Sequence, residues 1–434
     1  ERRGLIVSSN TDILLKVDEK PKGGQWFGLS FQHLFAMFGS TVLVPILVGI
    51  DPAIALLSSG LGTLAHMSVT RFKVPAYMGS SFAYIGAMQL LMKQGGMPAI
   101  AQGALTGGLV YLLVAIIVRF AGQGWIDRVL PPIVVGPIVM VIGLSLAPVA
   151  INDSMYTNPG AMTGYSLPFL AISMITVMAI VIFSIYGKGF LSVVPILLGI
   201  VTGYIAAIII GKVTGQSIVD FSNVSQASWL SLPTMEIPFL SYKWAFYPSA
   251  ILTMAPIAFV TMTEHFGHIM VLNSLTGKDY FKEPGLDRTL AGDGVAQVIA
   301  SFIGAPPVTS YGENIGVMAI TKIHSIYVIA GAAVLAVVVS FIGKLTALLT
   351  SIPSPVIGGA SIALFGVIAA SGLKIIVENK INFDIKRNLL ISSVVLVIGI
   401  GGMVLDITQN LQISSVAIAT IIGIVLNLVL PEEA

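Results

Sequence analysis

Apolar stretches of about 20 residues follow one another along almost the whole chain, with short polar breaks between them. A helix of about that length crosses the roughly 30 Å hydrocarbon layer of a bilayer and satisfies its own backbone hydrogen bonds. Only 10% of the residues are charged, against about 25% in soluble domains. The sequence therefore predicts an all-α integral membrane protein, multi-pass in the cell membrane, with the lipid bilayer as its main solvent.

The pattern predicts fourteen transmembrane segments. Two of them, 76–92 and 309–323, are too short to cross as regular helix, and Gly or Pro interrupts both. We expect these two to be interrupted helices with short extended stretches. The predicted spans are 27–49, 52–70, 76–92, 98–120, 128–150, 165–186, 190–211, 245–271, 289–304, 309–323, 325–347, 353–373, 389–405 and 413–430.

Positive charge is distributed unevenly between the two predicted sides. With a cytoplasmic N-terminus, all but four of the 22 Lys and Arg residues lie in inner loops and tails, the exceptions being Lys93, Lys212, Lys243 and Lys344. This satisfies the positive-inside rule. One span more or fewer would invert every later loop and destroy the bias. The N- and C-termini are therefore predicted to be cytoplasmic.

Residues 1–24 have no apolar core followed by a cleavage site, so they are interpreted as a cytoplasmic N-terminal arm. Its apolar residues are expected to lie on the membrane surface; they are Ile13, Leu14, Leu15 and Val17. The absence of cysteine excludes disulfides and Cys-based metal sites. A formal charge of +2 gives no basic surface suited to nucleic acid.

Several short motifs recur in the same order in the two halves of the chain. Leu130–Gly136 reads LPPIVVG and Ile352–Gly358 reads IPSPVIG, and the polar break ending at Gly86 recurs as the break ending at Gly316. A duplicated unit of seven spans, an odd number, places the second copy upside down. The sequence thus predicts two inverted 7-span repeats. Interrupted helices in such repeats leave backbone groups and half-helix N-termini free at mid-membrane, so the two breaks are the predicted ligand site.

Ionisable residues inside the spans are few, and each costs about 2.5 to 3.5 kcal/mol at the bilayer centre unless it is paired or hydrated. Glu264 and His268 are four residues apart on one face of a helix, where they can share a proton. The alternative for His268 is a buried ring satisfied by a carbonyl. His265 points about 100° away from that face, which favours packing. Asp293 is assigned to helix capping, and no role is assigned to His66 or His324.

No standard catalytic constellation is present. The string from Glu264 to His268 has the wrong order and spacing for a zinc protease motif. A Gly-x-Ser-x-Gly elbow and a phosphate-binding Gly-Lys-Ser/Thr loop are both missing from the sequence. An enzyme, for example an intramembrane hydrolase, is therefore a minor hypothesis, and neither a metal nor a cofactor is predicted.

The chain resembles the nucleobase-ascorbate transporters, also called nucleobase:cation symporters, and within them the bacterial uracil permeases. The likeness covers essentially the whole chain. It rests on four strings: Gln32-His33, Ser80-Ser81-Phe82-Ala83, Glu264-His-x-x-His268 and Glu313-Asn314-x-Gly316-x(4)-Thr321-Lys322. It implies a core domain of spans one to four and eight to eleven and a gate domain of the other six. The corresponding domains are 25–125 (core), 126–240 (gate), 241–348 (core) and 349–434 (gate).

The resemblance also implies how substrate is held. Glu264 and Glu313 would bind the pyrimidine ring, and backbone groups at Phe82 and Gly312 would complete the contacts. Carboxylates accept from the two N–H groups of uracil, and free backbone N–H groups donate to its carbonyls. Phe365 stands where the uracil permeases have a tyrosine that faces the site. Tyr311 would shape the pocket, and the supporting residues would be Gln32, His33, Ser81, Asn314 and Thr321.

Function is expected to be uracil import by proton symport through alternating access, with Glu264 and His268 carrying the proton. Sodium is the competing coupling ion. Purine carriers of this family place glutamine where Glu313 stands, so a xanthine or urate permease is the main alternative. An anion channel or exchanger on the same scaffold is a further one. A homodimer follows the tendency of the family and the commonest symmetry.

Overall fold

The computed structural model describes residues 14–408 and 411–431, and most of these residues are helical. The helices are α1 (Gly23–Val48), α2 (Pro52–Val69), α3 (Ile85–Ala121), α4 (Gly124–Val129), α5 (Pro132–Ser145), α6 (Ala147–Met155), α7 (Leu167–Tyr186), α8 (Pro195–Thr214), α9 (Ser222–Gln226), α10 (Pro248–Thr276), α11 (Leu286–Ile303), α12 (Gly312–Thr321), α13 (Ile326–Ser340), α14 (Gly343–Thr350), α15 (Ser354–Glu378), α16 (Lys386–Ile400) and α17 (Ser415–Val429). Three antiparallel strand pairs join β1 (Met78–Ser80) to β4 (Val308–Ser310), β2 (Tyr156–Asn158) to β3 (Thr163–Tyr165) and β5 (Leu405–Thr408) to β6 (Leu411–Ile413).

Every predicted span coincides with helix, or with strand followed by helix, in the described part of the chain. Seven helical stretches there are long and apolar enough to cross a membrane by length and composition. Large apolar side chains are exposed on the outer helices, for example Ile185 at 67% and Val213 at 82%, as a lipid-solvated surface requires. The fold is thus that of a multi-pass membrane protein, whereas the count of fourteen crossings stays a prediction.

Two predicted boundaries differ from the structure. Spans 76–92 and 98–120 are joined in one helix, α3, which bends at Gly96 (φ 64°, ψ −150°) where the sequence predicted a loop. Glycine allows this left-handed conformation, and Pro98 restarts the helix after it. The predicted span 128–150 is divided between α5 and α6, which meet at Leu146.

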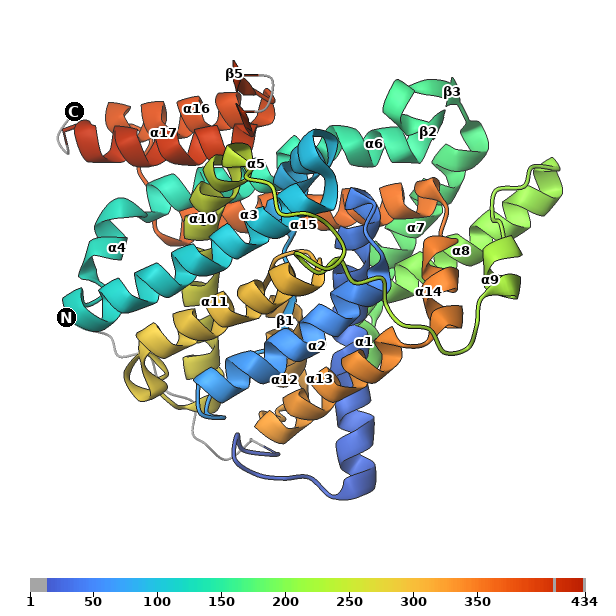
Figure 1. The fold of residues 1–434 in the computed structure, drawn as a ribbon, viewed down its shortest axis with the longest axis horizontal. Coiled ribbons are helices and arrows are strands. Elements are labelled where there is room, and N and C mark those ends of the chain that lie inside the picture. Colours follow the sequence, from blue (N-terminus) through green and yellow to red (C-terminus); the bar gives the residue numbers. More distant parts are fainter. Residues whose placement is uncertain (1–13, 409–410, 432–434) are drawn as a thin grey trace.

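The two predicted breaks lie side by side in the interior (Figure 1). Strand β1 pairs antiparallel with β4, with Met78 opposite Ser310 and Ser80 opposite Val308. Each strand leads directly into a helix, β1 through the short turn Phe82–Tyr84 into α3 and β4 into α12. The prediction of two partly extended, partly helical segments is therefore correct. Their pairing places two half-helix N-termini next to each other.

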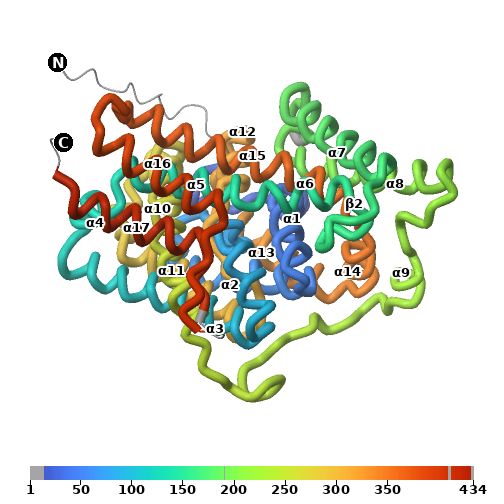
Figure 2. The backbone as a smooth tube through the Cα atoms, turned by 90° about the horizontal axis from the view of Figure 1, so that it is seen from above, coloured from blue at the N-terminus to red at the C-terminus, as the bar shows by residue number. Residues whose placement is uncertain are grey.

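Helix packing follows the same pattern in both halves. By chain order, α1, α2 and α3 of the first half correspond to α10, α11 and α13 of the second. In the first half, α1 and α2 both pack against α13. In the second half, α10 and α11 both pack against α3. The pair α7 and α8 contacts α15, as the pair α16 and α17 contacts α5. These two pairs lie on opposite sides of the molecule in both views (Figures 1 and 2). Exchanging the two halves maps these helix pairs onto each other, which agrees with a duplicated unit.

The described part of the N-terminal arm is fixed to the protein. The amide of Leu14 donates to the carbonyl of Lys322 (3.0 Å), and the amide of Ile326 donates to the carbonyl of Val17 (2.9 Å). Val17 is only 3% exposed. The prediction that Val17 lies on the membrane surface is therefore wrong, because its side chain belongs to a buried cluster that includes Met318 of α12 and Ile326 of α13. Ile13 lies outside the described residues.

Candidate functional site

Glu313 occupies the first turn of α12, immediately after β4. The hydroxyl of Ser40 in α1 donates a hydrogen bond to Glu313 Oε1 (2.9 Å). A carboxylate at this position is stabilised by the positive end of the helix dipole and by the unpaired amides of the first turn. Sequence and fold thus combine to hold a carboxyl group as a hydrogen-bond acceptor inside the protein.

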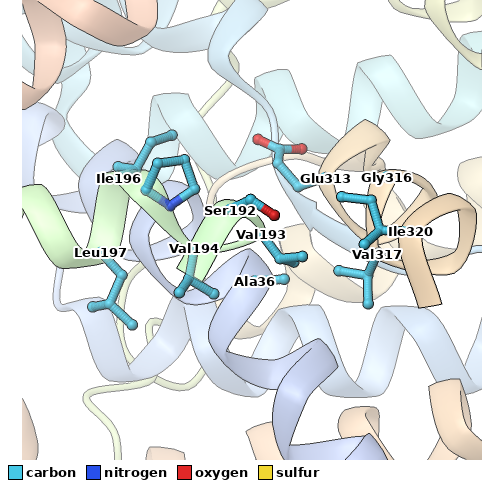
Figure 3. Close-up of a pocket in the computed structure, with 11 residues that line it drawn as sticks. Ala36, Ser192, Val193, Val194, Ile196, Leu197, Glu313, Gly316, Val317 and Ile320 are labelled. Carbon is cyan, nitrogen blue, oxygen red and sulfur yellow. The ribbon is translucent and has the colours of Figure 1, made fainter. Parts of the chain in front are cut away.

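A cavity of about 200 Å³ opens beside Glu313 (Figure 3). Figure 3 shows side chains from the start of α8 on one side and residues of α12 on the other. Glu313 is the one charged residue among the described residues that line it; the others are Ala36, Ser192, Val193, Val194, Pro195, Ile196, Leu197, Gly316, Val317 and Ile320. An apolar cavity with one strong acceptor suits a small ligand that carries hydrogen-bond donors.

Glu264 lies on α10, where its side chain is half-buried. It lies near enough to Glu313 for the two carboxylate charges to repel each other. Glu264 is not among the residues that line the cavity beside Glu313. The structure therefore brings the two predicted acidic residues into one electrostatic environment, with Glu313 alone on the cavity wall.

His268 contacts the second break and not Glu264. Its Nδ1 lies 3.0 Å from the hydroxyl of Ser310, the last residue of β4. Its Nε2 lies over Gly312, so close that a Cβ at that position would be 3.1 Å away. The predicted hydrogen bond between Glu264 and His268 is absent among the described residues, because the histidine ring turns toward β4. Gly312 therefore provides the space that the ring needs.

Asp293 is completely buried inside α11, and its assignment to helix capping is wrong. Its Oδ1 lies 3.1 Å from His66 Nδ1 on α2, and its Oδ2 lies 3.0 Å from His265 Nδ1 on α10. Both histidines are fully buried. Because a buried carboxylate must be paired, His66 and His265 are its partners. The absence of a role for His66 and the packing role for His265 are corrected accordingly.

His33 and Asn314 form a buried link between α1 and α12. Asn314 Nδ2 lies 3.1 Å from the carbonyl of His33 and 3.2 Å from His33 Nδ1. Together with the Ser40 contact, this link fixes the first turn of α12 against α1. Gln32 adjoins His33 and is half-buried.

The first break is held by backbone and tyrosine contacts. The amide of Ser81 donates to the carbonyl of Pro307 (2.9 Å), and the hydroxyl of Tyr311 donates to the carbonyl of Ser80 (2.6 Å). The ring of Tyr311 covers Gly79, where a Cβ would lie 2.5 Å from ring carbons. Tyr311 therefore packs across β1 and is only 4% exposed. Phe82 begins the turn into α3 and packs against the buried core.

The other two predicted residues, Phe365 and Thr321, do not line the cavity. Phe365 of α15 is 2% exposed and belongs to the hydrophobic core. Thr321 ends α12, where its hydroxyl donates to the carbonyl of Val317 (2.8 Å). The described residues contain no group of three or more His, Asp or Glu side chains placed to hold a metal ion.

Sequence reasoning missed three features of this site. Ser40, the start of α8 and the His66–Asp293–His265 cluster all come from segments outside the two breaks. Only for Asp293 was there a usable signal, since an acidic residue inside a predicted span needs a partner.

Comparison with known proteins places this geometry in context. A family model described as the permease family matches residues 24–408. The uracil permease of Bacillus subtilis is 48% identical over 426 residues, covering 98% of this chain and 97% of that protein. The uracil permease of Bacillus caldolyticus is 48% identical over 418 residues, with 96% and 95% covered. The uracil permease of Escherichia coli K12 is 42% identical over 413 residues, with 95% and 93% covered.

Two solved structures share the fold at low sequence identity. The transmembrane domain of the cyanobacterium bicarbonate transporter BicA aligns with a TM-score of 0.64 at 13% identity, over 95% of this chain and 99% of that one. The murine Solute Carrier 26 family member A9 anion transporter aligns with a TM-score of 0.68 at 12% identity, over 94% and 69%. The arrangement of helices is therefore one that membrane transporters use.

Proposed function

This chain belongs to the permease family, and on that premise we propose that it imports uracil together with a proton by alternating access. Family membership confirms the prediction that it is a membrane transporter and not an enzyme. The observation that carries the choice of ligand is Glu313, an acceptor held on the wall of a small cavity by Ser40 and by the first turn of α12.

Uracil suits this site because of its hydrogen-bonding pattern. Its two N–H groups need acceptors: Glu313 supplies one on the cavity wall, and Glu264 of α10, which does not line this cavity, is the proposed second acceptor. Its two carbonyls need donors, which the amides at the starts of α3 and α12 supply. Three relatives with 42% to 48% identity over nearly the whole chain are uracil permeases. Purines remain the alternative substrate class, and the acidic residue at 313 disfavours them.

The moving parts would be the predicted core and gate domains. In the proposed orientation, with both termini cytoplasmic, the start of α8 and the end of α12 lie toward the cytoplasm. The cavity beside Glu313 is lined by both, so it faces that side. The core carries both breaks. Its movement against the gate would then expose Glu313 to the outer side of the membrane. Assembly as a homodimer stays a prediction.

Proton coupling would use Glu264 and His268. Both lie on α10, and His268 contacts the strand that leads into Glu313. Since uracil is neutral at pH 7, one proton carried inward makes each cycle electrogenic. A charge that moves through 100 mV yields about 2.3 kcal/mol, which supports roughly fiftyfold accumulation. Neither a metal nor a cofactor takes part in this scheme.

An anion carrier is the rival from another class, because the solved structures of similar fold transport anions. The two neighbouring carboxylates, Glu264 and Glu313, disfavour it, since a bound anion would face their repulsion. Thermal unfolding of the purified protein separates the candidates. We expect uracil to raise the unfolding temperature by binding the native state, and xanthine, hypoxanthine, chloride, sulfate and bicarbonate to leave it unchanged.

The site is tested by replacing Glu313 with Gln. Glutamine keeps the size of the side chain but loses the charged acceptor, a hydrogen bond of about 1.5 to 3 kcal/mol. We expect uracil to bind about tenfold to hundredfold more weakly, measured by calorimetry on the purified variant. The matched control is Glu378→Gln, at an exposed carboxylate that pairs only with Lys374 among the described residues. Normal uracil binding by the Glu313→Gln variant would remove the basis of the proposal.

Coupling is tested in proteoliposomes. An imposed pH gradient, acidic outside, should drive uracil accumulation, whereas a sodium gradient at constant pH should not. Accumulation that follows sodium and ignores pH would replace the proton with sodium as the coupling ion and leave the uracil site intact.

A further inference from the structure

Three buried or half-buried contacts connect Asp293 to His268, and a fourth joins Asp293 to His66. Asp293 lies 3.0 Å from His265 Nδ1 and 3.1 Å from His66 Nδ1. The hydroxyl of Ser310 lies 3.4 Å from His265 Nδ1 and 3.0 Å from His268 Nδ1. The contacts run from His66 of α2 and Asp293 of α11 to His265 of α10, and Ser310 at the end of β4 joins His265 to His268 on the same helix. They use no residue of the cavity wall.

The hydrogens in this chain can be placed from donor and acceptor counts. Each of the two carboxylate oxygens of Asp293 faces a ring nitrogen. A protonated Asp293 has one O–H and would satisfy one ring only, whereas an ionised carboxylate accepts from both. An ionised Asp293 can accept from both rings when Nδ1 of His66 and Nδ1 of His265 each carry a hydrogen, so the nearby carboxylate favours a hydrogen on Nδ1 of His265.

Ser310 transmits this arrangement to His268. A hydroxyl donates one hydrogen and accepts on its lone pairs. Because His265 Nδ1 carries hydrogen, Ser310 cannot donate to it and can only accept from it. The single hydroxyl hydrogen of Ser310 is then available for the shorter contact, to His268 Nδ1. A nitrogen that accepts this hydrogen bond carries no hydrogen itself, so the hydrogen of a neutral His268 lies on Nε2.

We propose that Asp293 and His265 act through Ser310 to hold neutral His268 as the tautomer with its hydrogen on Nε2. Asp293, His265 and Ser310 are thus positioning residues for His268. Nε2 is the ring atom that lies over Gly312, at the start of α12. The hydrogen consequently faces the start of α12, whereas Nδ1 faces Ser310 at the end of β4.

This assignment has a consequence for the coupling step of the proposed function. A second proton on His268 enters at Nδ1, which is the atom that accepts from Ser310. The Ser310 hydroxyl must then turn and accept where it had donated. Protonation of His268 therefore changes the hydrogen bonding of β4, the strand that pairs with β1 and positions the start of α12.

The test is a direct measurement of the tautomer. The full-length protein is purified with ¹³C,¹⁵N-labelled histidine, whose ring shifts separate the two neutral tautomers. The chain has only 5 histidines, so a His268→Gln variant assigns the His268 signals by difference. At a pH where His268 is neutral, we expect a single population with hydrogen on Nε2. A neutral His268 with hydrogen on Nδ1 would overturn the proposal.

Variants test whether the chain of contacts sets the tautomer. Ser310→Ala removes the donor, so His268 should become a mixture of both tautomers, and Ser310→Thr, which keeps the hydroxyl, should restore the single form. His265→Phe should also give a mixture, because Ser310 is then free to donate or accept. The matched control is Ser58→Ala, at a fully buried serine whose hydroxyl has no hydrogen-bond partner among the described residues; it should leave His268 unchanged.

The outcomes separate this inference from the proposed function. A His268 signal that stays on Nε2 in both Ser310→Ala and His265→Phe shows that other contacts fix the ring, and the inference fails. If Ser310→Ala does not fold, the wild-type and His265→Phe spectra still decide. The tautomer measurement needs no uracil, so a protein that fails to bind uracil but gives the expected spectra refutes the proposed function and leaves the inference standing.

Discussion

At the scale of single residues, Glu313 depends on neighbours that come from elsewhere in the sequence. Its carboxylate accepts from Ser40 of α1, and its helix is held to the same α1 by the link between Asn314 and His33. A carboxylate in the interior of a membrane protein needs such donors, because lipid offers none. The orientation of Glu313 toward the cavity is therefore a property of α1 as much as of α12.

Replacing Ser40 with Ala tests this dependence. The variant loses a hydrogen bond to a charged group, and the carboxylate of Glu313 is then free to rotate away from the cavity. We expect uracil to bind about tenfold more weakly, equivalent to about 1.4 kcal/mol, as measured by calorimetry. Ser30→Ala is the control on the same helix, since Ser30 is buried and its hydroxyl has no hydrogen-bond partner among the described residues. Equal affinities in the two variants would contradict the role of Ser40.

The sequence predicts those residues of the site that form a local motif, but not side-chain partners that lie in other helices. The motif at Glu313 and Asn314 could be read directly, and the break around it was visible from its glycines. The pairing of Asp293 could not be read, because its partners His66 and His265 lie in two other helices. For His268, the sequence predicted the position on the helix but not the direction of the ring. Helical spacing correctly placed it near Glu264, but spacing gives no side-chain direction, and the ring turns toward Ser310.

At the scale of elements, the crossing of β1 and β4 is the structural centre of the site. Extended backbone at this depth is tolerated because the two strands satisfy each other's hydrogen bonds. The pair is only three residues long on each side, so it depends on close packing. The ring of Tyr311 lies on Gly79 and its hydroxyl donates to the carbonyl of Ser80, which ties α12 to the first break.

Gly79→Ala should disrupt this crossing. The new methyl group would lie 2.5 Å from the ring carbons of Tyr311, far inside van der Waals contact. We expect a loss of stability of about 1 to 3 kcal/mol, typical of overpacking, seen as a lower unfolding temperature, together with weaker uracil binding. Gly86→Ala is the matched control, because its nearest neighbour would be Leu146 at 3.9 Å. A Gly79→Ala protein as stable as the Gly86→Ala protein would show that Tyr311 does not need its present position.

The order of the elements was predictable because hydrophobic length and glycine-rich breaks are local signals. All the predicted spans contain helix, and both interrupted segments contain a strand. The kink at Gly96 was predicted as a loop, since Gly95-Gly96 with Pro98 is also a common loop composition. Which strand pairs with which depends on contacts between residues about 230 positions apart, and only the internal repeat indicated it.

At the scale of the whole molecule, contacts between the predicted core and gate differ at the two ends. In the proposed orientation, the cavity beside Glu313 separates the start of α8 from α12 on the cytoplasmic side. On the outer side the two domains touch. Gln94 Nε2 of α3 donates to Gln412 Oε1 of β6 (2.7 Å), and the Thr253 hydroxyl of α10 donates to the carbonyl of Gln412 (3.2 Å). This contact must break if the core moves against the gate.

A cross-link between positions 94 and 412 should therefore stop transport without stopping binding. The natural chain has no cysteine, so Gln94→Cys and Gln412→Cys introduce the only thiols for a short bis-maleimide reagent. We expect the cross-linked protein to bind uracil with nearly unchanged affinity, because the site lies elsewhere, but to lose net uptake in proteoliposomes. Each single variant treated with the same reagent should keep uptake.

The control cross-link lies within the gate hairpin. Asp406 pairs with Gln412 in the antiparallel strands β5 and β6, so Asp406→Cys with Gln412→Cys joins two segments of one domain. Alternating access does not require them to separate, and transport should continue. Full uptake by the 94–412 cross-linked protein would mean that α3 and β6 stay together through the cycle. In that case the domain boundary between core and gate would have to be redrawn so that β5 and β6 move with the core.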